Sequence, residues 1–271
     1  MSVLEAADRT VVVRRPHKRR LRALRDMLAV AGRNLTTIRR VPQLLVFTLI
    51  QPVIFVVLFR YVMGGAIRVP GVSYVNYLIP GVFVQAVTFG SIQTAIGLAA
   101  DLKSGLLERF RSLPMARSAL LSGRTIADLV RLTFVVSVIT GVGFLLGFRV
   151  QTGPLPFIAG LLLVLLFAYT LSWVFALVGL TVGDPESAQA ASFPVMFPLV
   201  FASSAFVPVA SMPWWLQGFA EHQPVSVTAS AVRALALGGP TRSFVLQSVA
   251  WSIGILLVMV PLAVRRYRKA I

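Results

Sequence analysis

The sequence predicts an all-α integral membrane protein with six transmembrane helices, and its composition and its apolar spans support this fold class. Hydrophobic residues make up 57% of the 271 residues and charged residues only 13%, with a mean hydropathy of +0.83. A soluble domain carries roughly 25% charged residues. The chain therefore has too little polar surface to cover a core in water, and lipid is the expected solvent for much of it.

Six apolar stretches approach or exceed the roughly 20 residues that cross a hydrocarbon core. The Gln51-Pro52 pair predicts a kink in the first span, and Pro194 and Pro198 free backbone carbonyls in the fifth, which neighbouring helices can accommodate. The expected spans are Gln43–Met63, Tyr77–Ala100, Thr125–Phe148, Pro156–Val182, Ala190–Val207 and Phe244–Val264.

The distribution of Lys and Arg predicts the orientation. Twenty of the 26 lie before the first span, between the second and third spans, or at the C-terminus, against four in the other loops. The positive-inside rule places both termini in the cytoplasm. We expect the chain in the cell (inner or plasma) membrane. A net charge of +17 could also suggest a nucleic-acid partner. We expect none, because the Arg clusters flank apolar spans.

The segment before the first span divides into two parts. Residues 1–18 are polar and basic and are expected to form a disordered tail, so that the transmembrane domain covers residues 19–271. Between residues 19 and 40, an apolar stripe at helical spacing lies opposite an Arg-rich face, as in a helix in the headgroup plane. The alternative is an ordinary basic juxtamembrane tail. The stripe consists of Leu21, Leu24, Leu28, Ala31, Leu35 and Ile38.

The loop between the second and third spans predicts a short amphipathic helix that ends before Pro114. Such a helix in a cytoplasmic loop could enter the groove of a soluble partner. The alternative is a helix that only rests on lipid. Its apolar face is Leu106, Leu107, Phe110 and Leu113, and its polar side is Glu108, Arg109 and Arg111.

The external segment between the fifth and sixth spans is too polar to cross a bilayer. Trp214 and Trp215 suit an aromatic anchor at the membrane surface. Residues 221–224 divide the segment into two short helices. They could form a hairpin that dips into the outer leaflet under a protein cover, or lie flat on the surface.

Several kinds of chemistry are missing from the sequence. The chain has no cysteine, no GxxxxGK[ST] phosphate loop and no GxSxG motif, so we expect no catalytic residue, no metal site and no ATP site of its own. The span interiors lack the Asp, Glu or His of an ion-coupled pump, so the energy for transport would come from elsewhere. Asp128 and Arg131, three residues apart on one helix, could form a structural pair.

The chain resembles the ABC-2 type transport permeases, most closely the daunorubicin-resistance (DrrB-like) permease subunits. The similarity extends over nearly the whole chain from about Arg19. The residues that carry it are 78–81 (LIPG), 105–114 (GLLERFRSLP), 172–177 (SWVFAL), 203–208 (SSAFVP), 212–217 (MPWWLQ), 223–225 (QPV) and 233–235 (RAL).

The resemblance implies a membrane subunit without catalytic residues, in a complex with a second permease copy, membrane lipid and usually two copies of a separate ATPase that binds ATP and Mg. It implies that residues 106–113 form the coupling helix, residues 19–40 a connecting helix and the external segment two re-entrant helices. Glu221, His222 and Arg233 become candidates for an external gate. Gln223 stands where Asn is more usual in the family.

The function implied is ATP-dependent export of a small hydrophobic or amphiphilic drug or a lipid. Export of a polysaccharide or a complex cell-envelope lipid is the alternative. The candidate residues for a substrate route, which could instead simply face lipid or neighbouring helices, are Phe47, Gln51, Phe55, Phe197 and Phe201.

Overall fold

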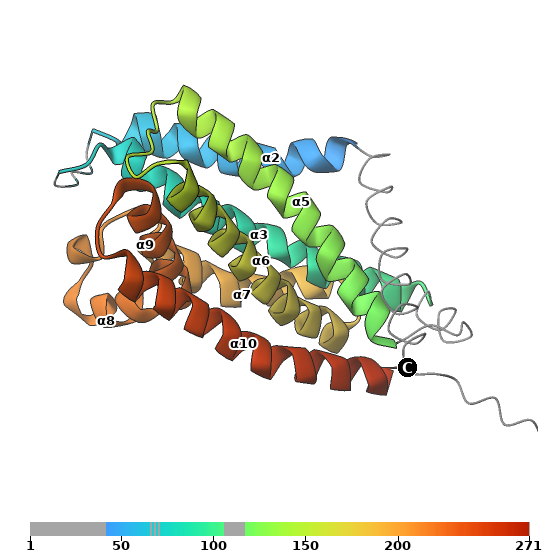
Figure 1. Cartoon of the computed structure of the whole chain (residues 1–271). Helices are drawn as coiled ribbons and strands as arrows, with labels where there is room; N and C mark the ends of the chain where they lie inside the picture. Colours follow the sequence, from blue (N-terminus) through green and yellow to red (C-terminus); the bar gives the residue numbers. More distant parts are fainter. Residues whose placement is uncertain (1–41, 66, 68, 70, 106–116, 271) are drawn as a thin grey trace, which may run out of the picture.

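The computed structural model describes residues 42–65, 67, 69, 71–105 and 117–270, and every regular element in them is helical (Figure 1). The all-α class is thus confirmed for these residues, whereas the expected tail and connecting helix lie outside them. The elements are α2 (Pro42–Leu58), the π-helical turn η1 (Phe59–Met63), α3 (Tyr74–Lys103), α5 (Arg117–Leu145), α6 (Pro154–Val182), α7 (Pro185–Phe201), the 3-10 turn η2 (Val209–Ser211), α8 (Trp214–His222), α9 (Pro224–Leu237) and α10 (Thr241–Ala270).

Four helices in the described residues are long and apolar enough to cross a membrane. They are α3, α6, the part Leu121–Leu145 of α5 and the part Thr241–Arg268 of α10. The helices at the expected first and fifth spans, α2 and α7, have 17 residues each. The count of six spans therefore stays a prediction that depends on these two shorter helices.

The bounds of α7 are shifted from the expected span at both ends. The helix begins at Pro185, because the Asp184 side chain accepts a hydrogen bond from the Ser187 N–H at 3.1 Å and caps the first turn. It ends at Phe201, six residues before the expected end, and an irregular segment follows. Apolar composition alone marks the length of a hydrophobic stretch and does not reveal such a break.

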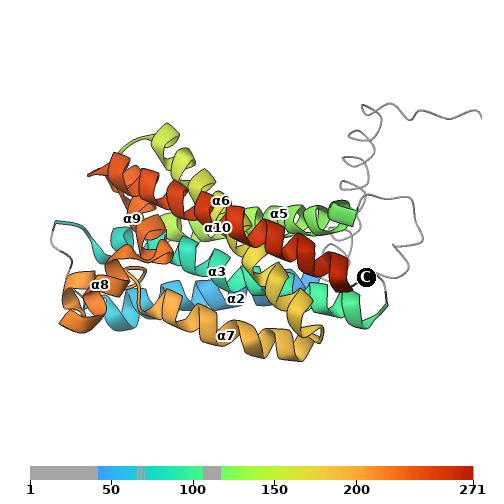
Figure 2. The same cartoon turned by 90° about the horizontal axis from the view of Figure 1, so that it is seen from below.

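The long helices run lengthwise, so the bundle has two ends (Figure 1). The end of α3, the start of α5 and the end of α10 lie together at one of them, which we call the basic end because it carries Lys103, Arg124, Arg265 and Arg268. The opposite end holds η1, α8 and α9. Helix α7 runs along the edge of the bundle, away from α5 (Figure 2).

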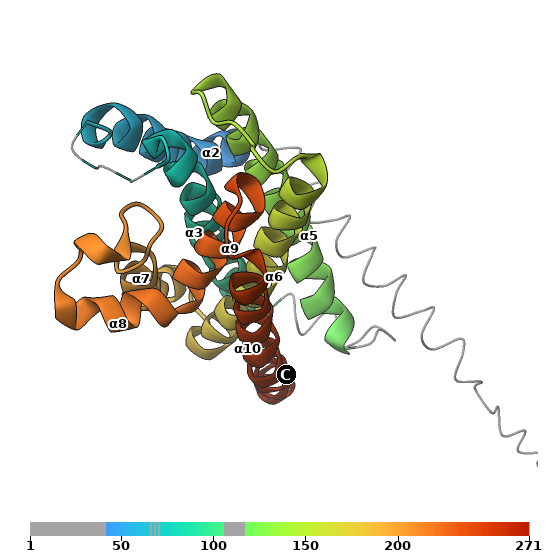
Figure 3. The same ribbon diagram turned by 60° about the vertical axis from the view of Figure 1, so that its left-hand side comes forward.

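Helix α3 lies at the centre of the bundle (Figure 3), and 78% of its most apolar stretch is buried. Its side chains divide into three faces at helical spacing. Gly81 and Phe89 face the α7 side, Ser91 faces α6 and Thr94 faces α5. Each neighbouring helix is thus positioned by a separate stripe of α3.

Two helices approach each other closely where α6 crosses α3. A methyl group at Gly179 of α6 would collide with the backbone of Ala95 of α3. Without a hydrophobic force between helices in lipid, close backbone approach through small residues is a main source of attraction. Gly179 therefore sets the distance between the two helices.

We expect Gly179→Ala to lower the thermal unfolding temperature of the detergent-purified protein, with a loss of roughly 1–3 kcal/mol from overpacking. Gly160→Ala on the same helix is the matched control. Its new methyl would meet Leu235 at 3.5 Å, an ordinary contact, so it should leave stability unchanged or raise it by roughly 0.5–1 kcal/mol. Equal unfolding temperatures for the two variants would contradict the close-approach role of Gly179.

Candidate functional site

The chain leaves the helical conformation directly after α7, and residues 202–208, here named the α7 break, have no regular structure. Ser203 to Phe206 are buried. Irregular backbone inside a membrane protein needs partners for its polar groups, because lipid offers none. Side chains from α3, α9 and the joint between α8 and α9 supply them here.

Arg233 of α9 is the main partner of the break. Its Nη2 donates to the carbonyls of Ser204 and Ala205, the latter at 3.1 Å, and its Nε donates to the carbonyl of Tyr77 at 2.9 Å. The guanidinium also lies 3.7 Å from the centroid of the Tyr77 ring. Arginine suits this place because its planar fork offers several fixed donors and stacks on an aromatic face.

Gln223 joins the end of α7 to the start of α9. Its Nε2 donates to the carbonyls of Leu199 at 2.7 Å and Ala202 at 3.2 Å, and its Oε1 accepts from the Val225 N–H at 3.2 Å. One side chain thus caps the last turn of α7 and the first turn of α9. At this position, where the resemblance implies that Asn is more usual, Gln223 thus makes these hydrogen bonds from the turn between α8 and α9.

The first turns of α3 hold the break from the other side. The Tyr74 hydroxyl donates to the Phe206 carbonyl at 3.1 Å, and the Tyr77 hydroxyl donates to the Ser204 carbonyl at 2.9 Å. A methyl group at Gly81 would collide with the Ala205 backbone. The break, α3 and α9 are therefore locked together as one unit.

A row of aromatic rings runs along α7 and into the break, with Phe193, Phe197 and Phe201 at steps of four residues on one side of the helix. Neighbouring centroids are 5.9 Å apart from Phe193 to Phe197, 4.8 Å to Phe201 and 5.9 Å to Phe206, and Phe59 of η1 stacks on Phe206 at 4.5 Å. We call these five residues the aromatic row. The three α7 rings are 37–47% exposed.

The structure brings three of the five expected route residues together. Phe197 and Phe201 belong to the aromatic row, and Phe55 of α2 contacts Phe201 at 6.4 Å between centroids. Gln51 lies one turn before Phe55 and is partly exposed. The side chain of Phe47 lies outside the described residues. A role in a substrate route stays a prediction for all five.

The expected gate residues do not form one cluster. Arg233 holds the α7 break, whereas Glu221 and His222 are exposed at the end of α8. The Nδ1 of His222 lies 3.0 Å from the Gly218 carbonyl of its own helix. Within the described residues, no hydrogen bond or ion pair joins Arg233 to Glu221 or His222.

The expected coupling residues, 106–111 and 113, lie outside the described residues, but the helix ends that flank them are described. Arg124 of α5 pairs with Asp101 of α3. Lys103 of α3 donates to Asp184 at 2.6 Å, before the start of α7. The Lys103 ammonium, and then the Ser187 N–H, lower the pKa of the Asp184 carboxyl to about 2. The end of α3, which precedes the loop, is thus joined by ion pairs to α5 and to the residue before α7.

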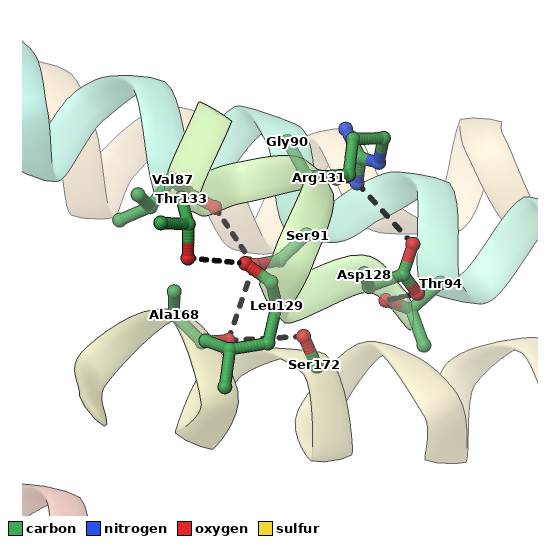
Figure 4. Close-up of polar contacts among 10 residues, drawn as sticks. All are labelled: Val87, Gly90, Ser91, Thr94, Asp128, Leu129, Arg131, Thr133, Ala168 and Ser172. Carbon is green, nitrogen blue, oxygen red and sulfur yellow. Dashed lines mark hydrogen bonds and ion pairs between the residues drawn. The ribbon is translucent and has the colours of Figure 1, made fainter. Parts of the chain in front are cut away.

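The pair expected between Asp128 and Arg131 is confirmed, at 3.4 Å in the buried contact of α5 with α3 (Figure 4). The Thr94 hydroxyl donates to the other Asp128 oxygen at 2.7 Å, and Arg131 donates to the Gly90 carbonyl at 2.9 Å. These contacts satisfy several polar atoms of the pair where α3 crosses α5.

Some residues of the site could have been found from the sequence and others could not. The repeat of Phe193, Phe197 and Phe201 at helical spacing is a visible signal, although only Phe197 and Phe201 are among the predicted route residues. Phe206 lies beyond the helix, so no periodicity connects it to the row. Tyr77 has no local signal, because its partner Ser204 is 127 residues away.

Replacing Arg233 by Lys should destabilise the detergent-purified protein by roughly 2–4 kcal/mol, because one ammonium cannot replace the forked contacts to three carbonyls. The measurement is thermal unfolding, with proteolysis of the 202–213 region as a second readout. Arg242→Lys, at an exposed position of α10, is the matched control. Equal stability of both variants would show that Arg233 does not hold the break.

Comparison with known proteins identifies the family. Residues 25–237 match the ABC-2 type transporter family. The chain is 32% identical to the daunorubicin resistance ABC transporter permease protein DrrB1 of Streptomyces coeruleorubidus, over 96% of this chain and 92% of that protein. It is 31% identical to the probable doxorubicin resistance ABC transporter permease protein DrrC of Mycobacterium tuberculosis, over 82% of this chain and 80% of that protein.

A more distant relative is the putative transport permease ycf38 of Cyanophora paradoxa, 25% identical over 78% of this chain and 74% of that protein. The family match extends from before α2 to the end of α9. It therefore includes the α7 break, the aromatic row and the loop between α3 and α5. The chain therefore belongs to the ABC-2 type transporter family, as a membrane permease of that type.

Proposed function

We propose that this chain is the membrane subunit of an ATP-driven exporter that moves a hydrophobic or amphiphilic drug out of the cell, while a separate ATPase subunit hydrolyses ATP. Two relatives are named for resistance to daunorubicin and doxorubicin. Their similarity to this chain supports a drug of that kind as cargo.

The aromatic row is the observation that carries the proposal. Its α7 rings are exposed at the edge of the bundle, where a flat, ring-bearing molecule dissolved in the membrane can stack against them. The neighbouring break contributes a buried polar interior. A surface with stacked rings beside polar groups fits an amphiphilic aromatic cargo better than a fully hydrated one.

The family match also supports a proposal for the assembly. Two copies of the permease would pair with two ATPase subunits, with six spans in each copy and both termini in the cytoplasm. In this orientation the basic end faces the cytoplasm, as the positive-inside rule requires, and α8 lies at the outer surface. Trp214 and Trp215, 85% and 66% exposed, would anchor α8 in the outer leaflet, while the buried α9 re-enters the bundle.

The mechanism would begin at the loop 106–113, which docks on the ATPase at the cytoplasmic end. Movement of this loop would reach α7 through the pair between Lys103 and Asp184, and α5 through the pair between Arg124 and Asp101. Because Pro194 and Pro198 weaken the hydrogen bonding within α7, this helix can bend and change the exposure of the aromatic row.

The coupling role is tested by replacing Glu108, Arg109 and Phe110 together by Ala. Since anchors of a docked helix contribute about 2 kcal/mol or more each, drug-stimulated ATPase activity of the reconstituted complex should fall at least about tenfold. Membrane insertion should not change. A matched control replaces Arg265 and Arg268, two exposed cations at the same end. Unchanged drug-stimulated ATPase activity and transport in the triple variant would refute the coupling role.

The substrate route is tested with Phe201→Ala. Loss of one stacking ring should weaken the apparent affinity for daunorubicin about two- to tenfold, measured as ATP-dependent uptake into inverted vesicles. Phe144→Ala is the control, because Phe144 is a comparably exposed ring, 40% against 41%, on α5. If both variants keep the wild-type affinity, the aromatic row is not part of the route.

A further inference from the structure

Gln85 in the middle of α3 is a buried side chain with unused hydrogen-bonding groups. It is 0% exposed, and neither its amide nitrogen nor its amide oxygen has a hydrogen-bond partner among the described residues. A buried polar group left unpaired costs roughly 1–3 kcal/mol. An apolar residue of the same size would avoid this cost, so the position is not optimised for stability.

The other buried polar residues of α3 differ from Gln85 in this respect. The Thr88 and Ser91 hydroxyls donate to carbonyls of the preceding turn, at 2.7 Å in each case. Thr94 donates to Asp128, and the Asn76 oxygen accepts from the Arg149 N–H at 2.9 Å. Among the buried polar residues of α3, Gln85 is therefore the exception.

The position of Gln85 on α3 indicates that this residue lies on the face of the helix toward α7. Gly81, one turn before it, approaches the Ala205 backbone, and Phe89, one turn after it, contacts the Phe197 ring at 6.3 Å. Residues four apart lie on the same face of a helix. Gln85 thus lies on the stripe that faces α7, between the buried break and the aromatic row.

Helix α7 is the neighbour most able to move away from this stripe. Pro194 and Pro198 lack the N–H groups that would bond to the carbonyls four residues earlier. The α7 side chains of the row are already partly exposed. A shift of α7 that lets a molecule pass from the row into the bundle would open a path to the Gln85 amide.

We propose that Gln85 is the polar contact for the cargo of the aromatic row. Its amide accepts from a hydroxyl, or donates to a ketone oxygen, of a fused-ring compound that stacks on Phe89 and Phe197. This inference rests on the proposed export function and deepens it by naming the residue that recognises the ring oxygens of a flat polycyclic cargo. The bond replaces the unpaired state of the amide, so cargo binding is favoured when α7 opens.

The test uses Gln85→Met, which keeps the length of the side chain and removes its hydrogen bonding. Anthraquinone and anthracene share the same three fused rings, but only anthraquinone carries ketone oxygens. Each compound competes with daunorubicin in ATP-dependent transport by the complex reconstituted with its ATPase. Gln247→Met, at an exposed position of α10, is the matched control.

Daunorubicin is kept far below the concentration that half-saturates transport, so that weaker binding of daunorubicin itself does not alter the competition. In the Gln85→Met variant, the anthraquinone concentration that halves daunorubicin transport should then rise about two- to tenfold, the usual worth of one hydrogen bond. The anthracene concentration should not change, and thermal stability should stay equal or rise. A similar shift for both compounds, no shift for either, or a loss of stability would overturn the proposal. Failure of the wild-type complex to transport daunorubicin would instead refute the export function, before any variant is compared, and this inference with it.

Discussion

The backbone between α7 and η2 must find its hydrogen-bond partners within the protein, and the arrangement of the helices at this end of the bundle depends on that constraint. In water, the irregular residues 202–208 could bond to solvent, but lipid cannot replace those bonds. Arg233 and Gln223 meet the requirement only if α9 lies inside the bundle beside α3. A helix of 14 residues, too short to cross the membrane, is therefore buried among much longer ones.

The two ends of α7 are held by different kinds of polar contact. At the break, many short contacts from three elements fix the chain. At the basic end, the one salt bridge among the described residues that joins the start of α7 to α3 is the exposed pair between Lys103 and Asp184. Exposed pairs of this kind contribute little stability. The polar contacts at the basic end of α7 are thus weaker than those at the break, and they involve Lys103, which precedes the loop expected to receive the ATPase.

The sequence was sufficient for what depends on local composition and spacing. The all-α class, the division of the external segment near Gln223 and the pair of Asp128 with Arg131 could all be predicted, because each needs only a few adjacent residues. The α7 break could not, since Arg233 and its partner Tyr77 are 156 residues apart. The same limit explains why the three predicted gate residues do not form one cluster. Glu221 and His222 are close to Arg233 in sequence, but α9 carries the arginine into the bundle and leaves the other two at its surface.

The cost of polar groups in lipid also explains why the α7 rings are exposed while the polar groups of the break that follows them are buried. Exposed phenylalanines lose nothing when lipid tails cover them, whereas an exposed amide or carbonyl would be left unpaired. A molecule that needs both kinds of contact can satisfy only the first while α7 is closed. If Gln85 contacts the cargo as proposed, these polar groups would gain partners only after α7 moves, so that cargo with ring oxygens would favour the open arrangement by its differential affinity for the two states. A purely apolar molecule, such as a membrane lipid tail, would contact the same rings without that gain, and the bundle would thereby distinguish cargo from the lipid that surrounds it.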